Sequence, residues 1–326
     1  MNLRPSHSTK PILLIALGGN ALIQKGQKGT ITEQFENLRV SIRQIASLTN
    51  DYRIIITHGN GPQVGNLLLQ QESCDAVPKL PLEILVAQTQ GQIGYMIESV
   101  LDEALMAQDA DFNPLVSLIT YVVVDEEDPA FKNPTKPIGP FFTAAEAGQL
   151  DYPTIESPNG FRRVVASPQP VTIIEKREIE RLLKSGFIVI CCGGGGIPVV
   201  RNGSALNGVD AVIDKDLASA LLATEIGADL LVIVTDVDGV LTDFATPKQR
   251  LIHQMQVDDA VEFLRNDKDG KGSMGPKVEA ALKFVQGSGK RAVITSIEAI
   301  CEGVTGAAGT QIIRNKNHIP TCAVVE

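Results

Sequence analysis

The chain lacks the features that would place it among secreted, disulfide-bonded or membrane proteins. It has five cysteines, an odd number without metal-like spacing, and two of them are adjacent in an apolar run, so we expect buried or incidental thiols. No run approaches the roughly 18 consecutive apolar residues of a membrane span. Residues 1–10 also lack the apolar segment of a signal peptide. These absences predict a cytoplasmic protein with no membrane partner.

An excess of positive charge is also missing. The 326 residues carry 29 Lys and Arg against 38 Asp and Glu, a formal net charge of -9. This charge gives no electrostatic support for nonspecific binding to nucleic acid. Any anionic ligand must therefore be held by local positive charge. With 44% hydrophobic and 21% charged residues the composition is globular, and the length predicts about two domains.

Motifs of acid–base and nucleophilic catalysis are absent or incomplete. There are four histidines and no G-x-S-x-G or H-E-x-x-H motif. Only His58 stands beside glycines at a predicted strand end, where we expect it to stabilise a turn. Gly270–Gly275 matches G-x-G-x-x-G, but it follows a charged, helix-like segment where that fold needs a strand, so we interpret the match as accidental. Asp267–Lys271 begins like a calcium loop but lacks the later ligands.

Short apolar runs alternate with segments of helical period. Residues 35–45 and 93–105 have apolar side chains every three or four positions, which predicts helices. The apolar runs are typical of buried parallel strands: Ile12–Leu17, Ile54–Thr57, Phe187–Cys192, Leu230–Thr235 and Ala292–Thr295. This order predicts an α/β fold, a three-layer αβα sandwich whose ligands lie beyond the carboxyl ends of the strands.

One segment interrupts this alternation. Asp125–Pro170 holds eight of the 18 prolines. We predict that it leaves the sheet and forms a small protruding lid subdomain at about residues 125–170.

Glycine clusters follow three of the predicted strands: Gly18-Gly19-Asn20, Gly59-Asn60-Gly61 and Gly193–Gly196. Each one alone is explained by a tight turn. Three at the same edge of one sheet favour an anion site, because glycine lets backbone amides approach a ligand closely.

Three lysines have sequence neighbours that would orient their side chains or place them at a helix start. Lys215 lies between Asp214 and Asp216, which would keep its ammonium charged and oriented, although a solvated helix start would explain the spacing equally well. Lys277 follows Gly275-Pro276 at a predicted helix start, over residues 277–286, where an anion would meet amides and ammonium together. Lys136 is flanked by prolines that restrict its backbone, although a surface lysine remains the simpler interpretation. Glycine loops with lysines favour phosphoryl transfer.

Six motifs together resemble the carbamate kinases, which have the amino acid kinase fold. They occur in the order of that family: Ala16–Ala21, His58–Asn66, Phe131–Pro140, Cys192–Val199, Val212–Asp216 and Gly272–Lys277. The resemblance spans Ile12 to Arg314 and implies reversible phosphoryl transfer from ATP to carbamate, giving ADP and carbamoyl phosphate, with Mg²⁺. It also implies a homodimer, and we expect no metal ligand from the protein itself.

The resemblance implies a role for each matching residue. The catalytic residues are Lys136, Lys215, Lys277, Asp214 and Asp216. Those that bind carbamate are Gly18, Gly19, Asn20, Gly59, Asn60, Gly61, Gly194 and Gly195. Those that bind the nucleotide are Thr235, Asp236, Gly239, Met274, Gly275 and Pro276. We expect residues 1–208 to form the carbamate lobe with its lid, and residues 209–326 to form the nucleotide lobe.

Two segments depart from the family pattern. Glu156–Phe161 replaces an acidic, Gly- and Arg-rich run ending in Trp, so a difference in lid closure or substrate preference is expected there. Thr235–Val240 looks more like the general amino acid kinase pattern, which bears on nucleotide preference. A kinase for another small carboxylate and an inactive sensor of nucleotide or carbamoyl phosphate remain alternatives. The presence of all three lysines argues against the sensor.

Overall fold

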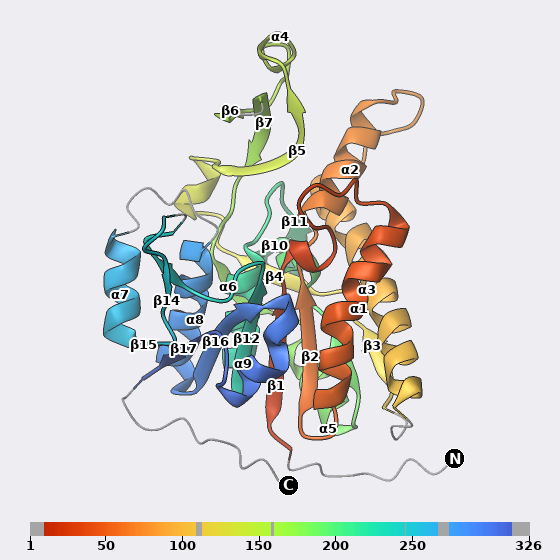
Figure 1. The fold of residues 1–326 in the computed structure, drawn as a ribbon. Coiled ribbons are helices and arrows are strands. Elements are labelled where there is room, and N and C mark those ends of the chain that lie inside the picture. Colours follow the sequence, from red (N-terminus) through yellow and green to blue (C-terminus); the bar gives the residue numbers. More distant parts are fainter. Residues whose placement is uncertain (1–9, 109–112, 158–159, 245, 267–273, 315–326) are drawn as a thin grey trace, which may run out of the picture.

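The computed structural model describes residues 10–108, 113–157, 160–244, 246–266 and 274–314. Its centre is an eight-stranded sheet of order β15-β17-β16-β12-β1-β2-β9-β3 (Figure 1). The strands are β1 (Ile12–Leu17), β2 (Arg53–His58), β3 (Leu115–Ser117), β9 (Ile188–Ile190), β12 (Leu230–Thr235), β15 (Gln254–Gln256), β16 (Arg291–Ser296) and β17 (Thr310–Ile313). Every neighbouring pair is parallel except β16 and β17. The predicted mostly parallel sheet is confirmed.

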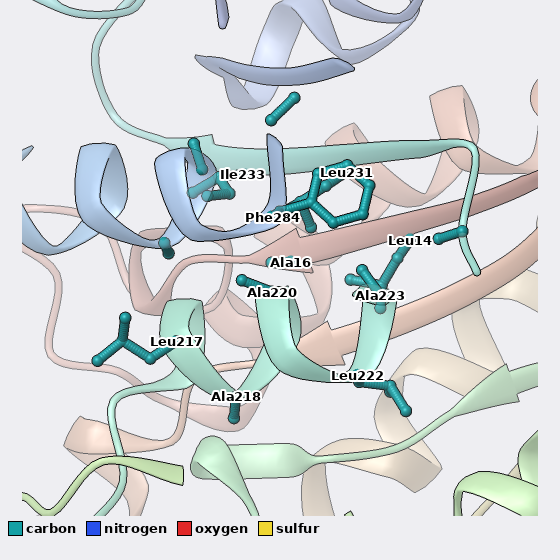
Figure 2. Packing of buried hydrophobic residues seen from close by; sticks show 14 of the residues in the cluster. Leu14, Ala16, Leu217, Ala218, Ala220, Leu222, Ala223, Leu231, Ile233 and Phe284 are labelled. Atoms are coloured by element: carbon teal, nitrogen blue, oxygen red, sulfur yellow. The ribbon is translucent and has the colours of Figure 1, made fainter. Parts of the chain in front are cut away.

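Helices cover both faces of this sheet. One face packs against α1 (Ile31–Leu48), α3 (Leu82–Ala107) and α9 (Ile300–Thr305). The other packs against α5 (Lys176–Lys184), α6 (Lys215–Glu225), α7 (Val257–Asn266) and α8 (Met274–Ser288). Because both faces of β1 are buried, its run is apolar throughout. Leu14 and Ala16 point to α6 and α8, where Phe284 packs (Figure 2), which confirms the three-layer αβα fold.

The predicted excursion is a small sheet that projects from the main body (Figure 1). It has the order β5-β7-β6 and carries one short helix, α4. The elements are β5 (Lys136–Phe142), α4 (Ala144–Ala147), β6 (Thr154–Ser157) and β7 (Gly160–Val165). We call this part the lid. The departure at Glu156–Phe161 lies in its β6–β7 hairpin, with residues 158–159 outside the described residues.

The remaining elements connect these parts. A four-stranded sheet contains β4 (Tyr121–Val124), β8 (Pro170–Ile173), β10 (Ile197–Asn202) and β11 (Ala205–Gly208). Helix α2 (Gly61–Glu72) follows β2, and β13 (Leu241–Thr242) pairs with β14 (Arg250–Leu251). Short 3-10 turns are η1 (Gly19–Ala21), η2 (Pro129–Phe131), η3 (Gly193–Gly195) and η4 (Ile297–Ala299).

Several predicted boundaries differ from the structure, and the two largest differences among the site elements are in β9 and α8. The strand predicted over Phe187–Cys192 ends at Ile190, because Cys192 adopts a left-handed conformation with φ 50° that opens the glycine loop. The helix predicted from Lys277 to Gln286 runs from Met274 to Ser288, with Pro276 in its first turn.

The described cysteines are free thiols. Cys191 and Cys192 are buried, Cys74 is exposed and Cys301 is half-buried, all as free thiols, whereas Cys322 lies outside the described residues. Within the described part of the chain, no helix combines the length and apolar character needed to cross a membrane.

Candidate active site

The three predicted glycine loops meet at the carboxyl edge of the sheet. A Cβ atom on Gly59 would lie 3.3 Å from the backbone nitrogen of Gly19, so the β1 and β2 loops are nearly in backbone contact. A Cβ atom on Gly194 would overlap the side-chain amide of Asn60, which joins the β9 loop to the β2 loop. Gly194 also has φ 66°, a conformation that favours glycine. A side chain would therefore overlap its neighbour at Gly194 and would be crowded at Gly59.

Two further contacts tie these loops to their neighbours. A Cβ atom on Gly18 would lie 2.9 Å from the carbonyl oxygen of Val234 in β12. One on Gly195 would overlap the carbonyl oxygen of Ile213, directly before α6. Together these contacts place the glycine loops beside the start of α6.

Asp214 caps α6 and links it to the lid. Its Oδ1 accepts hydrogen bonds from the backbone N–H of Asp216 at 2.9 Å and of Leu217 at 3.4 Å. Its Oδ2 accepts from Lys136 Nζ at 3.1 Å. Lys136, the proline-flanked lysine of the lid, therefore reaches the start of α6, which carries Lys215.

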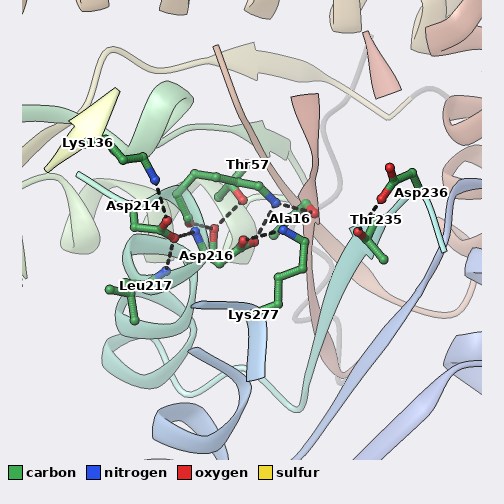
Figure 3. Close-up of polar contacts among 11 residues, drawn as sticks. Ala16, Thr57, Lys136, Asp214, Asp216, Leu217, Thr235, Asp236 and Lys277 are labelled. Atoms are coloured by element: carbon green, nitrogen blue, oxygen red, sulfur yellow. Dashed lines mark hydrogen bonds and ion pairs between the residues drawn. The ribbon is translucent and has the colours of Figure 1, made fainter. Parts of the chain in front are cut away.

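Asp216 holds the other two lysines (Figure 3). Its side chain is 4% exposed, and its two oxygens lie 2.6 Å from Lys215 Nζ and 3.3 Å from Lys277 Nζ. Lys215 also donates to the carbonyl oxygen of Ala16, near the end of β1, at 3.2 Å. Three ammonium groups thus gather around two carboxylates, which leaves positive charge beside the glycine loops.

Burial and pairing act against each other in this cluster. Burial lowers the pKa of Lys215, and the neighbouring Lys277 lowers it further, while Asp216 opposes both effects. Burial alone would raise the pKa of Asp216, but the two lysines hold it below its usual value. Asp216 therefore stays ionised and keeps both cations in place.

His58 at the end of β2 is buried and neutral. Burial lowers its pKa to about 4, and the nearby Lys215 contributes to the shift, although a hydrogen bond with Gly59 acts in the opposite direction. Its Nδ1 lies 3.0 Å from the carbonyl oxygen of Gly59 and donates to it. This contact with the turn fits the turn-stabilising role expected from the sequence.

The residues expected to bind nucleotide divide into two groups. Met274, Gly275 and Pro276 form the first turn of α8, which carries Lys277, and Thr235 Oγ1 donates to Asp236 Oδ1 at 3.2 Å at the end of β12. Gly239 instead packs on β17, where the backbone N–H of Val240 donates to Thr310 Oγ1 at 2.8 Å. Gly239 therefore makes its contacts away from the lysine cluster.

Two clefts open at this edge of the molecule. One of about 430 Å³ is lined by Asn20, Ile23, Gln24, Lys25, Asp236, Ile297 and Glu298. The other, of about 390 Å³, lies between α2 and the lid and is lined by Gly61, Pro62, Gly65, Asn66, Leu69, Pro137, Gly139 and Arg162. Predicted site residues line both clefts.

Thr89 and Gln90 of α3 contact the glycine loops but belong to none of the motifs predicted from the sequence. Their positions continue the buried stripe that contains Ile93 one turn toward the N-terminus, so helical spacing alone would have predicted their burial. A buried polar side chain in such a stripe is the signal that could have found them.

In the described part of the chain, no metal cage accompanies the lysines. Among the described residues, no group of three or more His, Cys, Asp or Glu side chains could hold a metal ion. The accidental match at Gly270–Gly275 and the calcium-like segment from Asp267 lie mostly outside the described residues.

Comparisons with known proteins agree with this geometry. A family model described as "Amino acid kinase family" matches residues 11–296. The carbamate kinase of Thermococcus kodakarensis is 45% identical over 312 residues, which cover 93% of this chain and 99% of that protein. The Escherichia coli carbamate kinase is 45% identical over 304 residues, or 92% of this chain and 98% of that one.

A solved structure shows the same fold. The carbamate kinase from Giardia lamblia bound to AMP-PNP is 38% identical to this chain and superposes with a TM-score of 0.86. The match covers 94% of this chain and 99% of that one. With this match and those in sequence, the chain belongs to the amino acid kinase family, within its carbamate kinase branch.

Proposed function

We propose that the protein is a carbamate kinase that catalyses the reversible reaction of ATP and carbamate to ADP and carbamoyl phosphate. The observation that carries the proposal is the cluster in which Asp214 and Asp216 hold Lys136, Lys215 and Lys277 beside three glycine loops. Carbamate kinases that are 45% identical over more than nine-tenths of the chain support the same conclusion.

The chemistry suits a site without a general base. Carbamate is already an oxyanion, so the nucleophile needs no deprotonation, and His58 is neutral and engaged with the turn. The main obstacle is repulsion between two anionic reactants. Positive side chains and oriented amides lower that barrier, because they act where charge is concentrated during direct in-line transfer.

The side chains divide between the two substrates. Lys215 and Lys277 would contact the ATP phosphates, oriented by Asp216, while Lys136 would reach the transferring phosphoryl from the lid. Backbone amides of the glycine loops would hold carbamate. In this assignment residues 1–208 bind carbamate or carbamoyl phosphate and residues 209–326 bind nucleotide.

Mg²⁺ fits this site as a companion of the nucleotide. Asp216 is committed to two lysines, and the described residues offer no cage of three acidic, His or Cys ligands. Mg²⁺ commonly keeps waters and binds through substrate phosphates, so the nucleotide would bring it. When bound, it adds charge neutralisation between the phosphate oxygens.

A homodimer in the cytoplasm completes the proposal. The outer face of α3 exposes Ile84, Tyr95 and Met106. Each is 11 residues, or about three helical turns, from the next, so the three side chains lie along one side of the helix. A second copy of the chain would bury this apolar stripe. Sedimentation velocity tests the assembly, with a dimer expected and a monomer contradicting it.

The activity is tested by ATP formation from ADP and carbamoyl phosphate, with acetyl phosphate and acetylglutamyl phosphate as controls. We expect ATP from carbamoyl phosphate alone. Activity with acetylglutamyl phosphate alone would identify a kinase for another carboxylate. Nucleotide binding without turnover of any of the three would indicate a sensor.

A further inference from the structure

Two adjacent polar residues of α3 are buried against the glycine loops. Thr89 is 0% exposed and Gln90 is 4% exposed, although both lie in a helix whose other buried residues are mostly apolar. Burying a hydroxyl and an amide is unfavourable unless both form hydrogen bonds. Their partners are the loops that surround the candidate site.

Thr89 fixes the direction of the Asn60 side chain. Its Oγ1 accepts a hydrogen bond from Asn60 Nδ2 at 2.9 Å and donates to the carbonyl oxygen of Val86 at 2.7 Å. Asn60 stands at the N-cap position of α2, yet its side chain makes no capping hydrogen bond. Asn60 is instead held against Gly194. As a result, the Asn60 side chain does not cap the first-turn N–H groups of α2, which Gly61 and Gln63 supply because Pro62 has none.

Gln90 fastens the glycine loop after β9. Its Nε2 donates to the carbonyl oxygens of Gly193 at 3.2 Å and Thr120 at 3.3 Å, and its Oε1 accepts from the backbone N–H of Thr120 at 2.9 Å. Thr120 Oγ1 in turn accepts from the backbone N–H of Cys192 at 3.0 Å. One side chain therefore ties the start of the loop, directly and through Thr120, to α3.

We propose that Thr89 and Gln90 are positioning residues that set the spacing between the Gly59–Gly61 loop and the Gly193–Gly196 loop, and thereby the affinity for the carbamoyl group. The proposal rests on the proposed function, which places that group between these loops. Lys215 and Lys277 are held separately by Asp216, so the effect is confined to one substrate.

Kinetics of full-length variants test this proposal in the direction of ATP synthesis. Thr89→Val keeps the shape of the side chain and removes the hydrogen bonds, whereas Thr89→Ser restores them. Gln90→Met removes the amide at similar length. We expect Thr89→Val to raise KM for carbamoyl phosphate about tenfold, the size of one lost buried hydrogen bond, with KM for ADP unchanged. Gln90→Met removes three hydrogen bonds and should raise KM for carbamoyl phosphate at least as much, again with KM for ADP unchanged. Thr89→Ser should stay near wild type.

A matched control separates positioning from simple stability. Gln311 of β17 is 1% exposed, and its Nε2 donates to the carbonyl oxygens of Gly303 and Ala308 at 3.2 and 2.8 Å, in a different part of the fold. Gln311→Met should lower Tm and leave both KM values unchanged.

The outcomes distinguish the two proposals. A wild-type protein that makes no ATP from carbamoyl phosphate contradicts the proposed function. If the wild type is active, the positioning role is overturned when Thr89→Val leaves KM for carbamoyl phosphate unchanged, or when Thr89→Val and Gln90→Met raise both KM values equally. The shape-preserving Thr89→Val keeps the test decisive even if Gln90→Met does not fold.

Discussion

Replacing Lys136 by alanine should impair transfer far more than it weakens the fold. The Lys136 side chain is 42% exposed and its Nζ lies 3.1 Å from Asp214 Oδ2. A pair this exposed contributes about 0–1 kcal/mol to stability. The same ammonium is placed to meet charge on the transferring phosphoryl, where removal of one preorganised donor commonly lowers kcat by about 10²–10³-fold. Turnover should therefore fall steeply while the free energy of unfolding changes by about 1 kcal/mol or less.

Lys290 provides the matched control for this experiment. Its Nζ lies 3.1 Å from Asp229 Oδ1, its side chain is 52% exposed, and the pair stands before β12 and β16, at the opposite edge of the sheet. Lys290→Ala should cost a similar small amount of stability and leave turnover unchanged. Urea unfolding and steady-state ATP synthesis of both variants are the measurements. Wild-type turnover in Lys136→Ala would remove this lysine from the mechanism.

Three further predictions concern the centre of the site. Asp216→Asn should destabilise the protein by about 3–5 kcal/mol in urea unfolding, because two buried lysines lose their partner; an unchanged midpoint would refute this. Gly194→Ala should reduce ATP synthesis strongly, because the new Cβ would overlap the Asn60 side chain and residue 194 has φ 66°, which favours glycine. Wild-type activity of this variant would show that the loop can relax. His58 has its folded pKa lowered to about 4 from 6.5, so the unfolded chain binds more protons between these values. Wild-type stability should therefore lose about 3 kcal/mol from this group as pH falls from 6.5 to 4, and His58→Gln should lack this loss; equal slopes would contradict the argument.

The central strands of the sheet were predictable because they are covered on both faces. Leu230–Thr235 is buried at every position, so its sequence is a continuous apolar run with little ambiguity. The end of β9 was not predictable in the same way. Cys191 and Cys192 are as buried as strand residues, and only the left-handed backbone of Cys192, which composition does not record, ends the strand there.

The site was predictable where backbone geometry demands particular residues. Glycines at close approaches and a lysine between two aspartates leave a local signature, and the structure brings them together. Gln90 leaves only its place in the apolar stripe of α3, because its partners Thr120 and Gly193 are 30 and 103 residues away in sequence. Such long-range hydrogen bonds become visible only once the chain is folded.

The central claim is that Lys136, Lys215 and Lys277 together contact the nucleotide phosphates and the transferring phosphoryl group. A crystal structure with ADP, Mg²⁺, carbamate and aluminium fluoride tests this claim most directly, because aluminium fluoride mimics the phosphoryl group during transfer. The account predicts that each of the three Nζ atoms lies within about 3.5 Å of a fluoride or a phosphate oxygen. A complex in which any one of them stays more than about 6 Å from all these atoms, beyond direct or water-mediated contact, would contradict it.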